Sequence, residues 1–202
     1  MIRRAAVSSL VLLLVFAGAC GSRTLEEIPG DAQVDTQPEA DATDFASCDG
    51  PGACLLVPKS CCGTCGAATP TDMIGVASSQ AGAYRAFVCE GSACPACAMQ
   101  QDAFLQSFCQ DGACAAIDLH TDPMTACTAD TDCTLRYASC CEPCGGPTSG
   151  LLALRTDRIA DYLAQICAPD TMCPLCAVIY PPDHHAACDA TGHCNVIVTP
   201  VP

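Results

Sequence analysis

The sequence predicts a small disulfide-rich α+β protein with two tandem homologous domains, each made of one helix and a short antiparallel sheet. Three observations indicate this fold class. All but one of the 21 cysteines fall into two sets with nearly the same spacing, each set encloses one helical pattern, and short β-prone runs lie beside the cysteines. The chain is therefore interpreted as a tandem duplication.

The cysteine spacing defines the two repeats, which cover residues 47–118 and 125–199. Partner cysteines are 79 residues apart, except that the offset is 78 at Cys167 and 80 at Cys194. The predicted disulfide framework consists of Cys48, Cys54, Cys61, Cys62, Cys65, Cys89, Cys94, Cys97, Cys109 and Cys114, and of Cys127, Cys133, Cys140, Cys141, Cys144, Cys167, Cys173, Cys176, Cys188 and Cys194. Each repeat is too small to bury a large core, so we expect crosslinks to supply much of its stability.

The N-terminus has the pattern of a signal peptide over residues 1–19. Arg3 and Arg4 precede an uncharged apolar run that is too short for a comfortable membrane span. Residues 16–20, Phe-Ala-Gly-Ala-Cys, resemble the lipobox of bacterial lipoproteins. The resemblance implies that Cys20 is diacylated and becomes the mature N-terminus. An ordinary secretory signal is the alternative, because Ala-Gly-Ala also fits the small-x-small cleavage pattern.

Export sets the expected chemistry of the remaining chain. Exported thiols pair as disulfides, and the 22 acidic against 6 basic residues left after cleavage, a net charge of −16, argue against nucleic acid as a partner. Residues 20–46 are acidic and poor in large apolar side chains, which predicts a disordered tether with an r.m.s. reach of roughly 25–30 Å. The lipoprotein resemblance implies anchoring in the cell envelope, and Gly21 after Cys20 favours the outer membrane, with the chain exposed to the periplasm or the cell surface.

The longest gap between cysteines in each repeat carries the helical pattern. Apolar side chains recur there at the i, i+3, i+4, i+7 spacing of one helix face; the residues are Ile159, Tyr162, Leu163 and Ile166 in the second repeat, and Ala81, Tyr84 and Val88 in the first. Both helices are predicted to end at a cysteine, Cys89 or Cys167. Short strands are predicted over 55–57, 98–99, 115–117, 135–137, 177–180 and 196–198.

Adjacent and closely spaced cysteines allow several chemistries. The vicinal pairs, Cys61 with Cys62 and Cys140 with Cys141, are each expected to link two separate segments, and the connectivity stays open. Two CxxC motifs per repeat would suit tetrahedral zinc in a reducing compartment, and the Cys-Pro-x-Cys motifs are similar to redox sites. In an exported chain the favoured interpretation is that these cysteines belong to different disulfides.

The first five cysteines of each repeat resemble the core of whey acidic protein (four-disulfide core) domains. In the second repeat this core runs from Cys127 to Cys144, with Asp130, Asp132 and Gly145 where that family often has acids and glycine. The spacings around the vicinal pair differ by a residue or so, and the upstream cysteines of the family are missing. Some members inhibit serine proteases with an extended loop. The resemblance therefore implies inhibition as an alternative function, with Lys59 and Arg136 as the nearest basic candidates for a specificity residue.

The polar residues give few other candidates. His184, His185 and His193 have no histidine at the matching positions of the first repeat, so we expect exposed loop histidines, or else a site private to the second repeat. Asp130 and Asp132 would suit calcium, but acids in a turn are the commoner explanation.

No catalytic motif is recognised, and neither a cofactor nor a metal is expected. The sequence thus predicts a non-enzymatic envelope lipoprotein that displays two disulfide-knotted domains as a binding or structural module for an unknown protein or envelope ligand. Protease inhibition is the alternative, and zinc binding is a weaker one.

Overall fold

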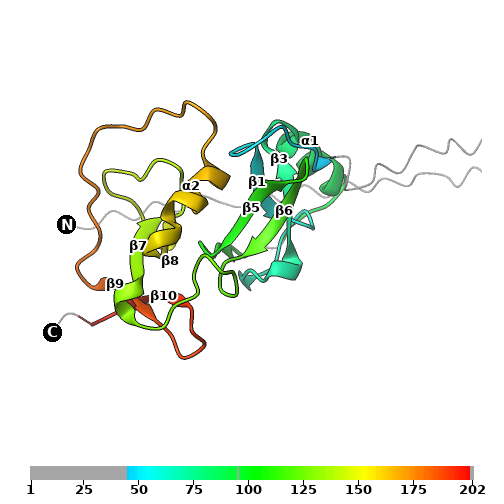
Figure 1. Cartoon of the computed structure of the whole chain (residues 1–202). Helices are drawn as coiled ribbons and strands as arrows, with labels where there is room; N and C mark the ends of the chain where they lie inside the picture. Colours follow the sequence, from blue (N-terminus) through cyan, green and yellow to red (C-terminus); the bar gives the residue numbers. More distant parts are fainter. Residues whose placement is uncertain (1–44, 95, 201–202) are drawn as a thin grey trace, which may run out of the picture. The chain divides into compact units, whose positions relative to one another are not determined.

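A computed structural model describes residues 45–94 and 96–200, and all of these residues belong to one compact unit (Figure 1). The predicted signal peptide, Cys20 and nearly all of the predicted tether lie outside the described residues. Within the described residues the chain forms two helices, five two-stranded sheets and ten disulfides. No helix in this part of the chain is long and apolar enough to cross a membrane.

The first repeat contains two antiparallel strand pairs, one parallel pair and one helix. Strand β1 pairs with β3, β5 pairs with β6, and the two-residue strands β2 and β4 pair in parallel. Its elements are β1 (Cys54–Pro58), β2 (Gly66–Ala67), β3 (Met73–Ala77), α1 (Ala81–Val88), β4 (Met99–Gln100), β5 (Leu105–Gln110) and β6 (Ala113–Asp118). Short 3-10 turns at Pro70–Asp72 and Ser78–Gln80 precede β3 and α1.

The second repeat contains a helix and two antiparallel strand pairs in the same order as the first, without the parallel pair and with one more 3-10 turn. Strand β7 pairs with β8 and β9 pairs with β10, both antiparallel. The elements are β7 (Cys133–Tyr137), β8 (Leu151–Arg155), α2 (Ile159–Ile166), β9 (His184–Cys188) and β10 (Cys194–Val198), with 3-10 turns at Asp130–Asp132, Thr148–Gly150 and Thr156–Arg158.

Both helices end where the sequence predicts. The amide of Cys89 caps α1 on the carbonyl of Arg85, and the amide of Cys167 caps α2 on the carbonyl of Leu163. Two turns of helix are marginal in isolation. Each helix is held by one buried tyrosine, Tyr84 or Tyr162, and by the disulfide at its C-terminal end.

Strands are found at five of the six predicted places, and the prediction of a strand at residues 177–180 is wrong. Residues 177–180 form no strand, although the matching part of the first repeat includes β4. Prolines bound this stretch, and it has no partner strand in the described chain. A further correction concerns His184 and His185, which begin strand β9 and do not lie in a loop.

The ten disulfides follow one connectivity in both repeats. The first cysteine of each set bonds the ninth, the second the tenth, the third the sixth, the fourth the seventh and the fifth the eighth. Each vicinal pair therefore links two separate segments, as predicted. Cys61 bonds the end of α1, whereas Cys62 bonds Cys94 in the following loop.

Backbone hydrogen bonds repeat along with the disulfides. The amide of Cys48 donates to Gly112 O at 3.0 Å, and that of Cys127 donates to Gly192 O at 2.8 Å. The offset of 80 residues at Cys194 comes from the second hairpin turn. Strands β5 and β6 are joined by Asp111 and Gly112, both with positive φ as in a type I′ hairpin, whereas the turn after β9 is one residue longer.

The main hydrophobic core contains side chains of both repeats. Phe108 of the first repeat lies edge-on to Tyr162 of the second, with ring centroids 6.0 Å apart. The buried members are Phe104, Phe108, Leu119, Leu152, Ala153, Leu154, Tyr162 and Cys194. Strand β8 supplies three consecutive buried residues to this core, which explains why it lacks the alternation expected of a half-exposed strand.

Candidate interaction segment of the second repeat

The three most exposed large hydrophobic side chains among the described residues lie in one loop between α2 and β9. Their exposed fractions are 94% for Met172, 105% for Leu175 and 68% for Ile179. We call residues 172–179 the apolar segment; it lies in the orange trace of Figure 1. Scattered exposed hydrophobic residues are ordinary, but three within eight residues of a crosslinked loop mark a candidate interaction surface.

Crosslinks and turns constrain the apolar segment. Cys173 bonds Cys141 and Cys176 bonds Cys144, so two disulfides connect it to the loop after β7. The amide of Cys176 also donates to Pro174 O at 3.1 Å. This i to i+2 bond is that of a γ-turn with Leu175 at its apex. Leu175 is therefore held as a projecting side chain between two crosslinked cysteines.

The C-terminal end of the apolar segment is anchored by Tyr180. Its hydroxyl donates a 2.6 Å hydrogen bond to Glu142 Oε1, and its ring stacks on Tyr137 with centroids 5.8 Å apart. The amide of Tyr137 donates to the same Glu142 oxygen at 2.9 Å. Burial, and then the bond to Glu142, raise the pKa of the Tyr180 hydroxyl above its usual value of 10, so this donor keeps its proton at neutral pH.

The backbone of the apolar segment is open, in contrast to its counterpart in the first repeat. There, Gly66 donates to Ala98 O at 3.4 Å and Ala68 donates to Gln100 O at 3.2 Å, which forms the β2–β4 pair. In the second repeat no such parallel pair forms among the described residues, and Gly146, one residue beyond the counterpart of Gly66, donates to the hydroxyl of Tyr137 at 3.2 Å. Within residues 45–94 and 96–200, the amides of residues 177–180 make no hydrogen bond.

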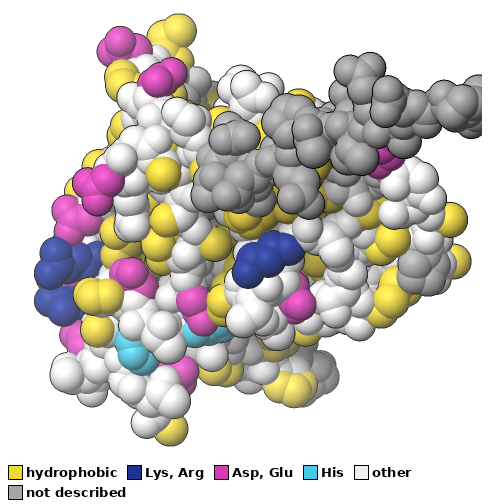
Figure 2. Space-filling model, turned by 90° about the vertical axis from the view of Figure 1, so that its right-hand side faces the viewer, with side chains coloured by type: hydrophobic (Ala, Val, Ile, Leu, Met, Phe, Trp, Pro, Cys, Tyr) yellow, Lys and Arg dark blue, Asp and Glu magenta, His cyan; other side chains and the backbone are white. Residues whose placement is uncertain are grey.

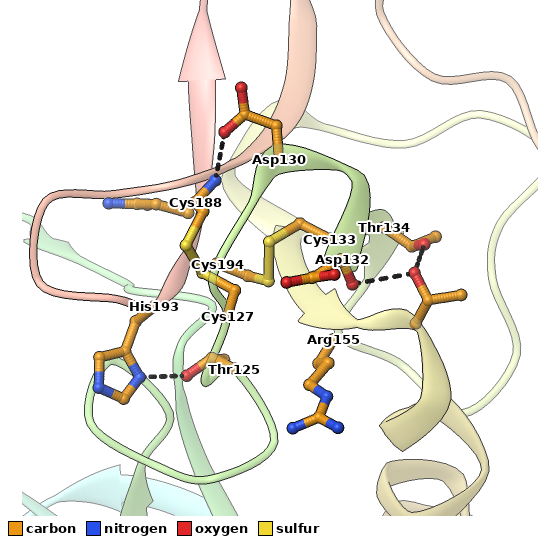
Figure 3. Close-up of a disulfide and its surroundings, with 12 residues drawn as sticks. Thr125, Cys127, Asp130, Asp132, Cys133, Thr134, Arg155, Cys188, His193 and Cys194 are labelled. Carbon is orange, nitrogen blue, oxygen red and sulfur yellow. Dashed lines mark hydrogen bonds between the residues drawn. A yellow bond between two sulfur atoms is a disulfide. The ribbon is translucent and has the colours of Figure 1, made fainter.

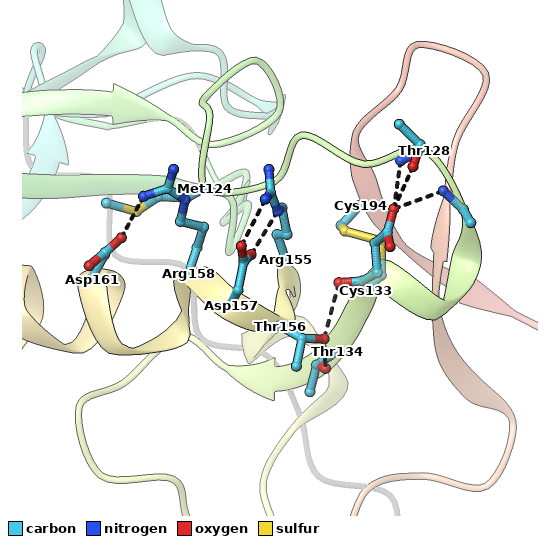
Figure 4. Close-up of polar contacts among 12 residues, drawn as sticks. Met124, Thr128, Cys133, Thr134, Arg155, Thr156, Asp157, Arg158, Asp161 and Cys194 are labelled. Atoms are coloured by element: carbon cyan, nitrogen blue, oxygen red, sulfur yellow. Dashed lines mark hydrogen bonds and ion pairs between the residues drawn. A yellow bond between two sulfur atoms is a disulfide. The ribbon is translucent and has the colours of Figure 1, made fainter.

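The charge of this region is acidic. No lysine or arginine occurs after Arg158, whereas Asp161, Asp170, Asp183 and Asp189 do. The last two cations in the sequence are paired with acids close to them in the chain: Arg155 Nε lies 2.7 Å from Asp157, and Arg158 lies 2.8 Å from Asp161 (Figure 4). On the face drawn in Figure 2, Lys and Arg side chains are sparse and lie among acidic ones.

The predicted calcium ligands have structural partners. Asp132 Oδ2 accepts from the amide and hydroxyl of Thr128 and from the amide of Ala129 at 2.8–3.0 Å, and these bonds hold its pKa below the usual 3.8. Asp130 Oδ1 accepts from the amide of Cys188 at 3.0 Å (Figure 3). The turn interpretation of these acids fits their contacts, since the donors are protein amides and a hydroxyl.

The three histidines are not brought together. His193 contacts the buried hydroxyl of Thr125 at 2.9 Å (Figure 3). His184 Nδ1 lies 2.8 Å from its neighbour Asp183, and His185 is exposed on β9. Each ring thus has a separate environment, and no shared site is formed by these side chains in the described part of the chain.

The basic residues considered for protease specificity differ in exposure. Arg136 is only 4% exposed; its guanidinium donates to Tyr137 O at 2.9 Å and Ser139 O at 3.0 Å, and lies 5.2 Å from the centroid of the Tyr162 ring. Arg136 therefore packs in the interior and is not presented to a partner. Lys59 is exposed, and its backbone carbonyl accepts the hydroxyl of Tyr84.

The CxxC motifs are paired with each other. Cys62 bonds Cys94 and Cys65 bonds Cys97, and the second repeat has the same arrangement. A sulfur in a disulfide is not the thiolate that zinc or redox chemistry uses.

The exposure of Met172, Leu175 and Ile179 is not predicted by the sequence. One signal was available: the residues opposite them in the first repeat are Ala93, Ala96 and Gln100. The second repeat therefore has large apolar residues where the first has small or polar ones. The sequence contains no sign that these side chains are exposed, because apolar residues in a cysteine-rich loop are equally compatible with a core.

The comparisons with known proteins give no relative. No protein-family model, no curated protein and no solved structure matches the chain.

Proposed function

We propose that this chain is an exported, non-enzymatic lipoprotein of the bacterial cell envelope that makes protein contacts through the apolar segment. In this proposal Cys20 carries the lipid, residues 20–46 form the tether, and residues 47–118 and 125–199 are two tandem homologous domains. Support for the duplication comes from the shared disulfide connectivity and from matching backbone hydrogen bonds. The lipobox resemblance supports the anchor, and Gly21 supports the outer membrane.

The observation that carries the binding function is the exposure of Met172, Leu175 and Ile179 on a segment held by two disulfides. Holding a loop in one conformation lowers the entropy lost on binding. Large apolar side chains at its apex supply the contact area, because burying a leucine contributes roughly 1.5–3 kcal/mol.

The anchor is tested by the intact mass of the protein purified from membranes of its producing cells. We expect a chain that begins at Cys20, carries acyl groups, and gains twenty hydrogens on reduction. A mature chain that lacks the acyl mass contradicts the anchor, and cysteines that alkylate without reduction contradict the disulfides.

The binding function is tested by a photo-crosslinking amino acid at Leu175 in living cells, with the same group at Ala96 as the matched position of the first repeat. We expect protein crosslinks from position 175 that decrease when Met172 and Ile179 are replaced by Ala and Gln. Equal crosslinking from both positions contradicts a role of the apolar segment.

Serine protease inhibition is the second candidate function, and the exposure of Leu175 between two crosslinked cysteines favours it. The specificity residue would then be Leu175, which suits an apolar primary pocket such as that of chymotrypsin, in place of Lys59 or Arg136. Inhibition of chymotrypsin that is lost in Leu175→Ala supports this candidate, and absence of inhibition contradicts it.

A further inference from the structure

We propose that the partner of the apolar segment is a second copy of this chain, joined by antiparallel pairing of residues 175–179 around a two-fold axis through Ala177. The inference rests on the proposed binding function and names its partner. Its starting point is the unpaired backbone of this stretch, because a segment with free amide and carbonyl groups is a template for strand pairing.

The side chains alternate in the manner of a strand. Leu175, Ala177 and Ile179 are exposed, whereas Cys176 and Val178 are partly buried. One face of the stretch is thus open and carries a large, a small and a large apolar residue. This order is the same in both chain directions.

That symmetry matches an isologous interface. With Ala177 opposite its own copy, Leu175 of one chain faces Ile179 of the other, and each large side chain meets a large one across the pair. A partner strand of different sequence would have no need of this order.

The available hydrogen-bonding groups fit the same register. Pairing of this kind uses the amides and carbonyls of residues 175, 177 and 179, which point to one edge, and not those of residues 176 and 178. The one internal backbone bond here is made by the amide of Cys176, which is not needed. Pro174 and Pro181 lack an amide hydrogen and limit the pairing to the stretch between them.

The contact is small, so the dimer is weak in solution. Interfaces well below about 1,200 Å² are typical of transient complexes. Attachment of both copies to one membrane would raise their effective concentration. Net negative charge on both copies opposes association, and salt screens this repulsion. Dimerisation therefore strengthens as ionic strength rises, the opposite of a contact built on ion pairs.

The test is analytical ultracentrifugation of the unlipidated mature chain over a range of concentration and salt. We expect reversible dimerisation that becomes stronger as the salt concentration rises. The double variant Leu175→Ala, Ile179→Gln should raise the dimer dissociation constant at least tenfold. The new residues are those at the matching positions of the first repeat, Ala96 and Gln100. The control is Leu55→Ala, since Leu55 is an exposed leucine outside the segment (47%). Intact mass confirms ten disulfides in every variant.

A second measurement locates the axis. Ala177→Cys should form a disulfide between two copies under mild oxidation, because residues opposite each other in an antiparallel pair lie within reach of such a bond. Ala98→Cys is the matched control at the equivalent exposed position of the first repeat, where the carbonyl already accepts the amide of Gly66.

Three results overturn the inference: a chain that stays monomeric at millimolar concentration, a dimer that the double variant leaves unchanged, or equal crosslinking at positions 98 and 177. Binding of the wild-type chain, but not the double variant, to phosphatidylcholine vesicles without dimerisation also overturns it in favour of a lipid surface. None of these results bears on the proposed function, which is tested separately by the acyl mass of the mature chain and by the crosslinking of Leu175 to other proteins.

Discussion

The hydroxyl of Tyr162 donates a 2.6 Å hydrogen bond to the backbone carbonyl of Ala138, the residue that follows strand β7. Tyr84 makes the equivalent bond in the first repeat, at 3.0 Å to the carbonyl of Lys59, the residue that follows β1. Each helix is thus tied through its one buried tyrosine to the end of the first strand of its repeat. The bond recurs although the residues at the acceptor positions differ, since only the backbone carbonyl is used.

Replacing Tyr162 by Phe should lower the free energy of unfolding by about 1–2 kcal/mol, because it removes one partly buried hydrogen bond to the Ala138 carbonyl and preserves the ring. The measurement is denaturant unfolding with disulfides intact. Tyr84→Phe should show a loss of similar size. Unchanged stability in both variants would show that water replaces the hydroxyl at no cost.

Gly52 should not tolerate a side chain. Its φ is +74°, its amide donates to Gln165 O at the end of α2 at 3.2 Å, and an added Cβ would lie 2.7 Å from Ala168 N. Gly52→Ala should therefore destabilise the protein by about 1–3 kcal/mol. Thermal unfolding measures the effect.

The matched control for Gly52 is Gly82 in α1, where an added Cβ meets nothing within 4 Å. Gly82→Ala should raise stability by about 0.5–1 kcal/mol, because alanine loses less backbone entropy than glycine in a helix. If both substitutions change the free energy of unfolding in the same direction, the close contact at Gly52 is not what excludes a side chain there.

Acid should weaken the fold partly through Asp132. Its folded-state pKa lies below the usual 3.8, because the amide and hydroxyl of Thr128 and the amide of Ala129 donate to the charged carboxylate. The stabilisation is therefore complete above the unfolded-state pKa and is lost as pH falls through the folded-state pKa. Asp132→Asn should be less stable than wild type at pH 7, and the difference should shrink as pH falls below about 4. A difference independent of pH would mean that charge has no part in the effect.

Exposure should set the order of disulfide reduction. Both cysteines of the Cys65–Cys97 bond are exposed, whereas Cys194, which bonds Cys133, is 1% exposed within the main core. Since reduction needs access of a thiolate to sulfur, Cys65–Cys97 should open at a lower dithiothreitol concentration. Differential alkylation followed by peptide mass analysis measures the order, and simultaneous opening of both bonds would indicate reduction by global unfolding.

Strand prediction from the sequence succeeded where an apolar run adjoins a cysteine, as at β1, β7 and β10. It missed β3 and β8, which are nearly continuous buried runs with no alternation between faces. It missed β9 because a strand that begins with two histidines after two prolines has weak local preference. Only pairing with β10 makes that stretch a strand.

The repeated cysteine spacing, the position of the two helices and their ends at cysteines were all determined by the sequence, because spacing and periodicity are local properties of the chain. Tertiary structure decided which sulfur atoms meet, that Arg136 is buried, and that Leu175 is exposed. These properties depend on distances between segments far apart in the chain. Residues 98–100 and 177–179 demonstrate the limit: they occupy the same position in the repeat, yet among the described residues only the former include a strand with a partner.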